Sequence, residues 1–110
     1  MKPFLLLSLI LSSPLLAAQT FRCSGFLNGK LDFIGEVSLA QGQKNQAVGQ
    51  SGELEFMMSS VGINNVELQG YNFNEPSRSY STATPTTKGD VVELAIWKRE
   101  FLVEVKCILL

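Results

Sequence analysis

The sequence predicts a small all-β domain, an antiparallel barrel or sandwich of six to seven strands with one disulfide. Apolar and polar residues alternate over several short segments, as they do in strands with one buried face. Turn-forming residues separate these segments, and beyond residue 18 no stretch keeps a helical period. Two cysteines, Cys23 and Cys107, lie near the two ends of this part of the chain.

The first 18 residues have the three-part pattern of a secretory signal peptide. Lys2 gives a positive start, residues 4–11 are apolar apart from one serine, and small residues end at Ala18. A membrane anchor is the alternative, but serines and Pro14 interrupt the apolar stretch, which is shorter than the roughly 20 residues of a spanning helix. We therefore expect residues 1–18 to be removed as a signal peptide.

The predicted mature part, residues 19–110, is long enough for a single β domain with one modest core. The whole chain has nine Lys and Arg residues and ten Asp and Glu residues, and the charges are spread along the sequence without a basic cluster. This pattern differs from the basic footprint of a nucleic-acid-binding protein and from the basic face of a membrane-surface helix. We expect a periplasmic or secreted domain that binds no nucleic acid and has no stable membrane insertion.

Two cysteines in an exported chain most simply form one disulfide. Cys23 is predicted to lie on the same strand face as Phe21, and Cys107 on the same face as Val103 and Val105. Both cysteines therefore fall on predicted buried faces. In the chain-entropy model a loop of this length stabilises the folded state by about 4–5 kcal/mol. Two free buried thiols are the alternative.

The predicted strands follow one another along the mature chain. They cover residues 20–27, 30–40, 53–58, 63–73, 91–97 and 101–108, with a further short strand around 79–83.

The first two strands are predicted to form a hairpin. Asn28-Gly29 lies between them, and both residues tolerate the positive φ of a type I′ turn. A simple two-residue hairpin would set apolar Phe21 opposite charged Glu36. We therefore expect one β-bulge, at Gly25 or Gly35, that shifts the register.

The middle of the chain is less regular. Residues 41–52 are polar and rich in glycine and glutamine, which predicts a long exposed loop. The strand at 53–58 directs Leu54 and Phe56 inward. In the strand at 63–73 the apolar parity changes after Gly70, which predicts a second bulge.

The last two strands are joined by a predicted charged turn at 98–100. The first of them carries Val92, Leu94 and Ile96 on one face and Trp97 on the other. Trp97 then either covers one end of the core or stands exposed as a binding anchor.

The sequence shows no recognisable catalytic constellation, and we expect no enzymatic activity, no cofactor and no metal site. Histidine, the commonest general base and a common zinc ligand, does not occur in the chain. Glu53 and Glu55 are spaced to share one strand face, where they could act as acid and base or bind Ca²⁺. The solvated face of an amphipathic strand is the interpretation we prefer.

The predicted binding region is the polar stretch at 72–88, because long loops on a rigid β scaffold commonly carry binding residues. It combines aromatic residues, a proline and an arginine, residue types that favour protein recognition. An ordinary polar loop with packed aromatics is the alternative. The candidate partner-binding residues are Phe73, Ser77, Arg78, Ser79, Tyr80 and Lys88.

Two short runs and one cysteine near the end of the chain resemble those of a known family. These are Thr87-Lys88-Gly89-Asp90, Lys98-Arg99-Glu100 and Cys107. They resemble the tail of the C-type lysozyme inhibitor family, periplasmic or membrane-bound, and Phe21-Arg22-Cys23 resembles its aromatic-x-Cys opening.

The resemblance implies a small exported β-barrel that inserts two loops into the cleft of a lysozyme-like enzyme. By this resemblance Ser77, Arg78, Ser79 and Tyr80 match the serine-containing loop, and Lys88 matches the Lys-Gly loop. The chain departs from the family pattern because its first loop has no glycine and no aromatic residue directly precedes Lys88.

Three hypotheses follow for function. The first is a non-enzymatic binding domain that recognises a protein or envelope component through residues 72–88. The second is an inhibitor of a lysozyme-like enzyme. The third is a structural or assembly protein that pairs with a partner through an exposed edge strand.

Overall fold

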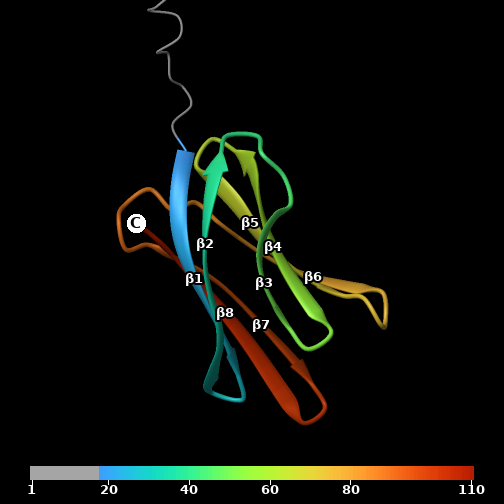
Figure 1. Cartoon of the computed structure of the whole chain (residues 1–110). Helices are drawn as coiled ribbons and strands as arrows, with labels where there is room; N and C mark the ends of the chain where they lie inside the picture. The colour runs from blue at the N-terminus through green and yellow to red at the C-terminus, as the bar shows by residue number, and fades with distance from the viewer. Residues whose placement is uncertain (1–17) are drawn as a thin grey trace, which may run out of the picture.

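The computed structural model describes residues 18–110, and residues 1–17 of the predicted signal peptide lie outside this described part. Within it, eight antiparallel strands form two four-stranded sheets that face each other (Figure 1). The strands are β1 (Ala18–Leu27), β2 (Lys30–Ala40), β3 (Gln46–Ser51), β4 (Leu54–Gly62), β5 (Asn65–Asn72), β6 (Ser77–Ala83), β7 (Val91–Lys98) and β8 (Phe101–Leu109). The all-β prediction is confirmed, with eight strands instead of six or seven.

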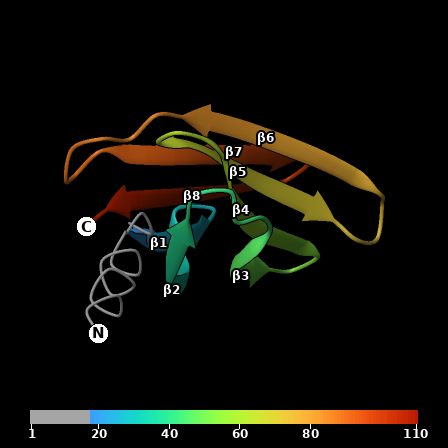
Figure 2. The ribbon, with the colours of Figure 1, turned by 90° about the horizontal axis from the view of Figure 1, so that it is seen from above.

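The architecture is a sandwich, because the two sheets do not close into a barrel. One sheet has the order β2-β1-β8-β7, and the other has the order β3-β4-β5-β6. Seen from above, β2 and β3 lie near one another on one side, and β6 and β7 lie near one another on the other (Figure 2). Across residues 18–110, no helix has the length and apolar character needed to cross a membrane.

The core lies between the two sheets and is built from alternate residues of nearly every strand. Its largest fully buried side chains are Phe21, Phe56, Leu39, Met58, Leu68, Val66, Val92, Val103 and Val105. The apolar residues predicted to point inward in the strands around Leu54, Val92 and Val103 are buried, which confirms these predictions.

The predicted hairpin and its bulge are both present. Leu27 pairs with Lys30, and the turn residues Asn28 and Gly29 have φ values of 50° and 83°, as a type I′ turn requires. The register shifts between Gly25 and Phe26, as predicted for one of the two candidate glycines. As a result Phe21 lies opposite Val37 instead of Glu36.

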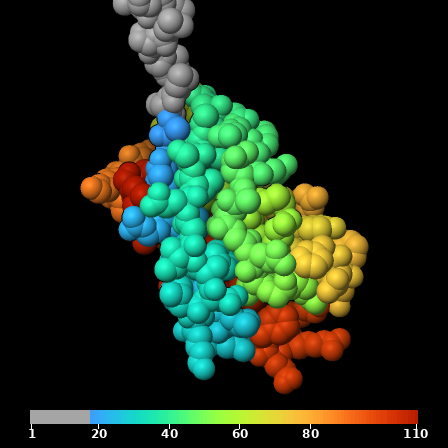
Figure 3. All heavy atoms as spheres, in the orientation of Figure 1, coloured from blue at the N-terminus to red at the C-terminus, as the bar shows by residue number. Residues whose placement is uncertain are grey.

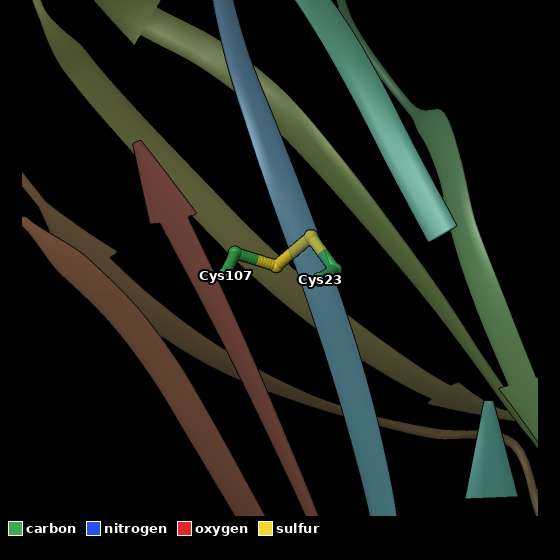
Figure 4. Close-up of a disulfide and its surroundings, with 2 residues drawn as sticks. All are labelled: Cys23 and Cys107. Carbon is green, nitrogen blue, oxygen red and sulfur yellow. A yellow bond between two sulfur atoms is a disulfide. The ribbon is translucent and has the colours of Figure 1, made fainter. Parts of the chain in front are cut away.

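The disulfide joins the first strand to the last. Cys23 and Cys107 are direct cross-strand partners in β1 and β8, and both residues are fully buried (Figure 4). The same two strands are held by regular pairing from Phe21 with Leu109 to Leu27 with Val103. The predicted Cys23–Cys107 bond is therefore confirmed, and it lies inside a continuous sheet.

The prediction of a long exposed loop at 41–52 is wrong, because residues 46–51 form β3. This strand pairs with β4, buries Val48, and turns back at Gly52 with a φ of 59°. Val48 is the only large apolar residue in β3, so the sequence offers too little alternation to predict a strand.

The predicted bulge at Gly70 is also wrong. Pairing continues without a shift through Phe56 with Gly70 and Leu54 with Asn72. A Cβ at position 70 would lie 2.6 Å from Ile96 Cδ1 and 2.9 Å from a ring carbon of Phe56. Gly70 is therefore an inward position where neighbouring side chains leave no room, and Tyr71 belongs to the outer face.

The two sides of the sandwich differ in how tightly they close. On the β2–β3 side the Phe33 ring packs against Gly25 and Gly49, and a Cβ at Gly35 would lie only 2.8 Å from the carbonyl oxygen of Val48. Within the described residues, no backbone hydrogen bond joins β2 to β3 or β6 to β7. The two sides differ in their packing: the atoms of β2 and β3 lie against each other (Figure 3), whereas a groove lies between β6 and the end of β7, which we call the open side.

Candidate functional site

The open side of the sandwich contains a groove of about 240 Å³ between β6 and the end of β7. Its lining residues are Leu54, Gly70, Asn72, Glu75, Ser77, Ser79, Ile96, Trp97 and Lys98. β6 and β7 belong to different sheets and are not paired beside the groove. Two of the sequence-predicted binding residues, Ser77 and Ser79, contribute to it.

A polar cluster forms one end of the groove and connects the two sheets. We call it the Glu53 cluster; its members are Glu53, Asn72, Asn74, Glu75 and Lys98. Lys98 Nζ, at the end of β7, donates to Glu53 Oε1 at 3.0 Å and lies 2.8 Å from Glu75 Oε1. Asn72 Nδ2 also donates to Glu53 Oε1, at 2.8 Å, and Asn74 Nδ2 donates to Glu53 Oε2 at 3.3 Å.

The turn between β5 and β6 is fixed by the same cluster. Asn72 Oδ1 accepts hydrogen bonds from the backbone N–H groups of Asn74 and Glu75, at 2.9 and 3.0 Å. The backbone N–H of Phe73 donates to the carbonyl of Glu53 at 3.2 Å. The turn that leads into β6 is therefore held against the β3–β4 turn.

These contacts shift the pKa values of two charged groups. The hydrogen bond from Asn72, followed by those from Lys98 and Asn74, lowers the pKa of Glu53 from its ordinary value. The hydrogen bonds to Glu75 and Glu53 raise the pKa of Lys98. Both groups are held in their charged forms at neutral pH, so the cluster is a fixed arrangement of charges beside the groove.

Trp97 is exposed rather than part of the core, which answers the question that the sequence left open. The residue is 77% exposed, and its Nε1 donates to the backbone carbonyl of Arg99 at 3.3 Å. Arg99 occupies the β7–β8 turn with a φ of 53°. The indole is thus tied to its own hairpin and still presents most of its surface.

The structure places the predicted binding residues Ser77 to Tyr80 on two faces of a strand. The short strand predicted around 79–83 is present as β6, which begins two residues earlier, at Ser77. Ser77 and Ser79 point to the groove side, opposite Asn72 and Gly70. Arg78 and Tyr80 alternate with them and so lie on the outer face of the sheet.

The outer face around Arg78 is an ordered polar and aromatic surface. The Arg78 guanidinium lies 5.1 Å from the ring centroid of Tyr71, and its Nη1 donates to Gln69 Oε1 at 3.3 Å. Tyr80 is 54% exposed, and Phe73, in the adjoining turn, is 47% exposed. Arginine held over an aromatic ring loses less freedom on binding than a free side chain does.

Lys88 lies apart from these residues, in the segment that follows the far end of β6. Asp90 Oδ2 accepts hydrogen bonds from the N–H groups of Thr86 and Thr87, each at 3.0 Å. These two bonds lower the pKa of Asp90. Gly89, with a φ of 96°, donates its N–H to the carbonyl of Leu109. Lys88 is therefore exposed on a braced turn near the last strand, at the opposite end of β6 from Ser77.

Sequence reasoning missed Lys98 as a member of the site and assigned Glu53 to a solvated strand face, whereas Asn72 was included as the first residue of the predicted 72–88 region. Lys98 shares the inward parity of Val92, Leu94 and Ile96, and an inward lysine at a strand end requires a carboxylate partner. This parity was the available signal. The partner Glu53 is 45 residues away in sequence, so only the packing of the two sheets identifies it.

The arrangement offers several groups that could contact a binding partner. Within residues 18–110, no group of three or more Asp, Glu, His or Cys side chains comes together as a metal site would require. The carboxylates of Glu53 and Glu75 are both paired with Lys98. What the site offers is an exposed indole, strand-edge hydroxyls and fixed charges.

Comparison with profiles of known protein families, with curated proteins and with solved structures returns no match.

Proposed function

We propose that the protein is a small non-enzymatic binding module that is exported to the periplasm or secreted, and that it recognises another protein through the groove between β6 and β7. The observation that carries this proposal is Trp97, a large aromatic side chain 77% exposed beside a groove with ordered walls. Tryptophan is among the residues most often responsible for binding energy at protein interfaces.

The surroundings of Trp97 support recognition of a protein. The β5–β6 hairpin beside the groove carries exposed Phe73 in its turn, and Arg78 and exposed Tyr80 lie on the outer face of the same hairpin. Aromatic residues and arginine are enriched at the centres of interfaces. The Glu53 cluster fixes the geometry of the groove, so less conformational freedom is lost on association.

Export is supported by two independent features. The N-terminal pattern is that of a signal peptide, and disulfides persist in oxidising compartments outside the cytoplasm. Mass spectrometry of the protein purified from its own compartment tests this part, with removal of 18 residues and one intact disulfide as the expected result.

The binding proposal is tested by capture of partners from the cell-envelope fraction with the immobilised mature domain. Trp97→Ala should weaken binding of the captured partner at least about 30-fold, the effect of losing a hot spot of roughly 2 kcal/mol. Leu31→Ala is the matched control, because Leu31 is also an exposed apolar residue but belongs to β2. A partner that binds the Trp97→Ala variant and the wild type equally well would contradict the proposal.

Inhibition of a lysozyme-like enzyme is the second candidate. It is supported by the sequence resemblance and by the braced turn that presents Lys88. Lysozyme activity should fall when the purified domain is added, and Lys88→Ala should abolish this effect while Lys30→Ala, in the β1–β2 hairpin, keeps it. Because Ser79 lies away from Lys88, Ser79→Ala tests a separate contact. No loss of lysozyme activity with excess wild-type domain would exclude this candidate.

A further inference from the structure

β6 is an edge strand without the usual protection against pairing with another strand. Natural edge strands are commonly protected by charged residues, prolines or bulges. β2 carries Lys30, Asp32 and Glu36, and β7 carries Glu93 and Lys98. β3 has a register shift and is covered by its contact with β2.

By contrast, β6 has one charged residue, Arg78, and neither a proline nor a bulge. All seven of its residues pair in regular register with β5, so no bulge interrupts its edge. The strand lies at the end of its sheet, and in the view from above it is the outermost strand of the molecule (Figure 2). Its free edge is therefore available to another strand.

We propose that β6 pairs with β6 of a second copy of this chain, antiparallel and about a two-fold axis at Tyr80, so that the two four-stranded sheets become one sheet of eight. A two-fold contact of this kind is self-complementary and is the commonest arrangement in homodimers. The inference does not depend on the partner proposed above, because it concerns the purified chain alone.

The sequence of β6 fits this register. The axis sets Ser79 opposite Ser81 of the second copy and Arg78 opposite its Thr82, while the two Tyr80 side chains face each other. Serine and threonine pairs and aromatic pairs are favourable across antiparallel strands, and no like charges are opposed. Adjacent registers lack this symmetric placement of the two exposed tyrosines.

The charges on the outer face are also complementary in this register. Within one copy, Arg78 pairs with Tyr71, and Thr82 pairs with Glu67. Across the axis, Arg78 therefore lies in the same row as Thr82 and Glu67 of the second copy. Arg78 of one copy is therefore attracted to Glu67 of the second copy, which lies on β5, the strand next to the paired β6. The two-fold axis repeats this attraction between Glu67 of the first copy and Arg78 of the second.

The β6 sequence is complementary to itself, and pairing with a strand from another protein would not require this. We therefore choose a second copy of the chain as the partner. The two occupants give different results in solution. If β6 accepts only a strand from another protein, the purified domain is a monomer at all concentrations.

Sedimentation of the purified, oxidised mature domain over a concentration series tests the proposal. The wild type should show a concentration-dependent dimer. Thr82→Arg would oppose two arginine pairs across the axis and should raise the dimer dissociation constant about tenfold, since each like-charge pair costs roughly 0.2–1 kcal/mol. The double variant Arg78→Glu/Thr82→Arg restores opposite charges and should recover the dimer.

Thr86→Arg is the control, because it adds the same charge at an exposed position outside β6. A second measurement does not require the fold to accept an arginine at position 82. Under oxidation Tyr80→Cys should form a disulfide between two copies, and Thr82→Cys should not. A monomer at every concentration overturns the proposal. A dimer that Thr82→Arg and Thr86→Arg leave equally stable, or equal cross-linking by the two cysteine variants, overturns it as well.

Discussion

Phe33 shows how a single side chain closes one side of the sandwich. It extends from β2 and packs in the space that Gly25 of β1 and Gly49 of β3 leave free. Its ring centroid lies 6.1 Å from that of Phe56, in the core. One aromatic ring thereby contacts strands of both sheets, and this contact depends on the two glycines having no side chains.

A methyl group at position 49 should therefore destabilise the domain. In Gly49→Ala the new Cβ would overlap the Phe33 ring, and we expect the free energy of unfolding to fall by about 1–3 kcal/mol, as in other overpacked cores. Urea denaturation measures this change. In a Phe33→Leu background the ring is absent, so the same substitution should cost clearly less; an equal cost in both backgrounds would refute the explanation.

At the scale of elements, the Glu53 cluster connects turns of one sheet to a strand of the other. The β3–β4 turn supplies Glu53, the β5–β6 turn supplies Glu75, and β7 supplies Lys98. The pairs are partly exposed, so their contribution to stability is reduced by solvent screening. Their main effect is to fix the position of three chain segments around the groove.

The cluster should make stability depend on pH in the acid range. The pKa of Glu53 is lower in the folded state, so its stabilising effect is complete above its ordinary value of 4.5 and is lost as the pH falls through the folded-state value. Chemical denaturation between pH 3 and pH 7 should show a weaker pH dependence for Glu53→Gln than for the wild type. Glu93→Gln is the matched control variant, because it also removes one carboxylate but lies on the outer side of β7, away from the cluster.

The elements that sequence could predict are those whose apolar alternation is strong or whose turns have a specific chemistry. Asn28-Gly29 defined the first hairpin, and the alternation around Val92 and Val103 defined the last one. β3 was missed because Val48 is its only large apolar residue. A bulge was predicted at Gly70 because a glycine at an inward position interrupts the alternation of apolar and polar residues in the sequence.

The candidate site was only partly predictable for a related reason. Ser77, Arg78, Ser79 and Tyr80 were selected by residue type, but their alternation between two faces follows from β6 being a strand. Their relation to Lys98 depends on how two sheets pack, which local sequence patterns do not contain. Lys88, selected with them, is separated from Ser77 by the length of β6.

At the scale of the whole molecule, the Cys23–Cys107 bond closes a loop of 84 residues, almost the entire domain. Cys23→Ala/Cys107→Ala should lower the free energy of unfolding by about 2–5 kcal/mol, the range found when small exported domains lose a disulfide. Urea denaturation with and without reductant checks this. Reductant should destabilise the wild type and leave the double variant unaffected; a wild type insensitive to reduction during unfolding would contradict the expectation.

The pairing of the first strand with the last has a consequence for biogenesis. β1 lies between β2 and β8, and the N–H of Leu110 donates to the carbonyl of Thr20. During vectorial delivery of the chain, N-terminus first, β1 and β2 emerge early, but one edge of β1 stays unsatisfied until the final residues arrive. The native sheet can therefore be completed only after β8 has emerged, and a nascent chain stalled before residue 101 would expose a half-paired strand to chaperones and proteases.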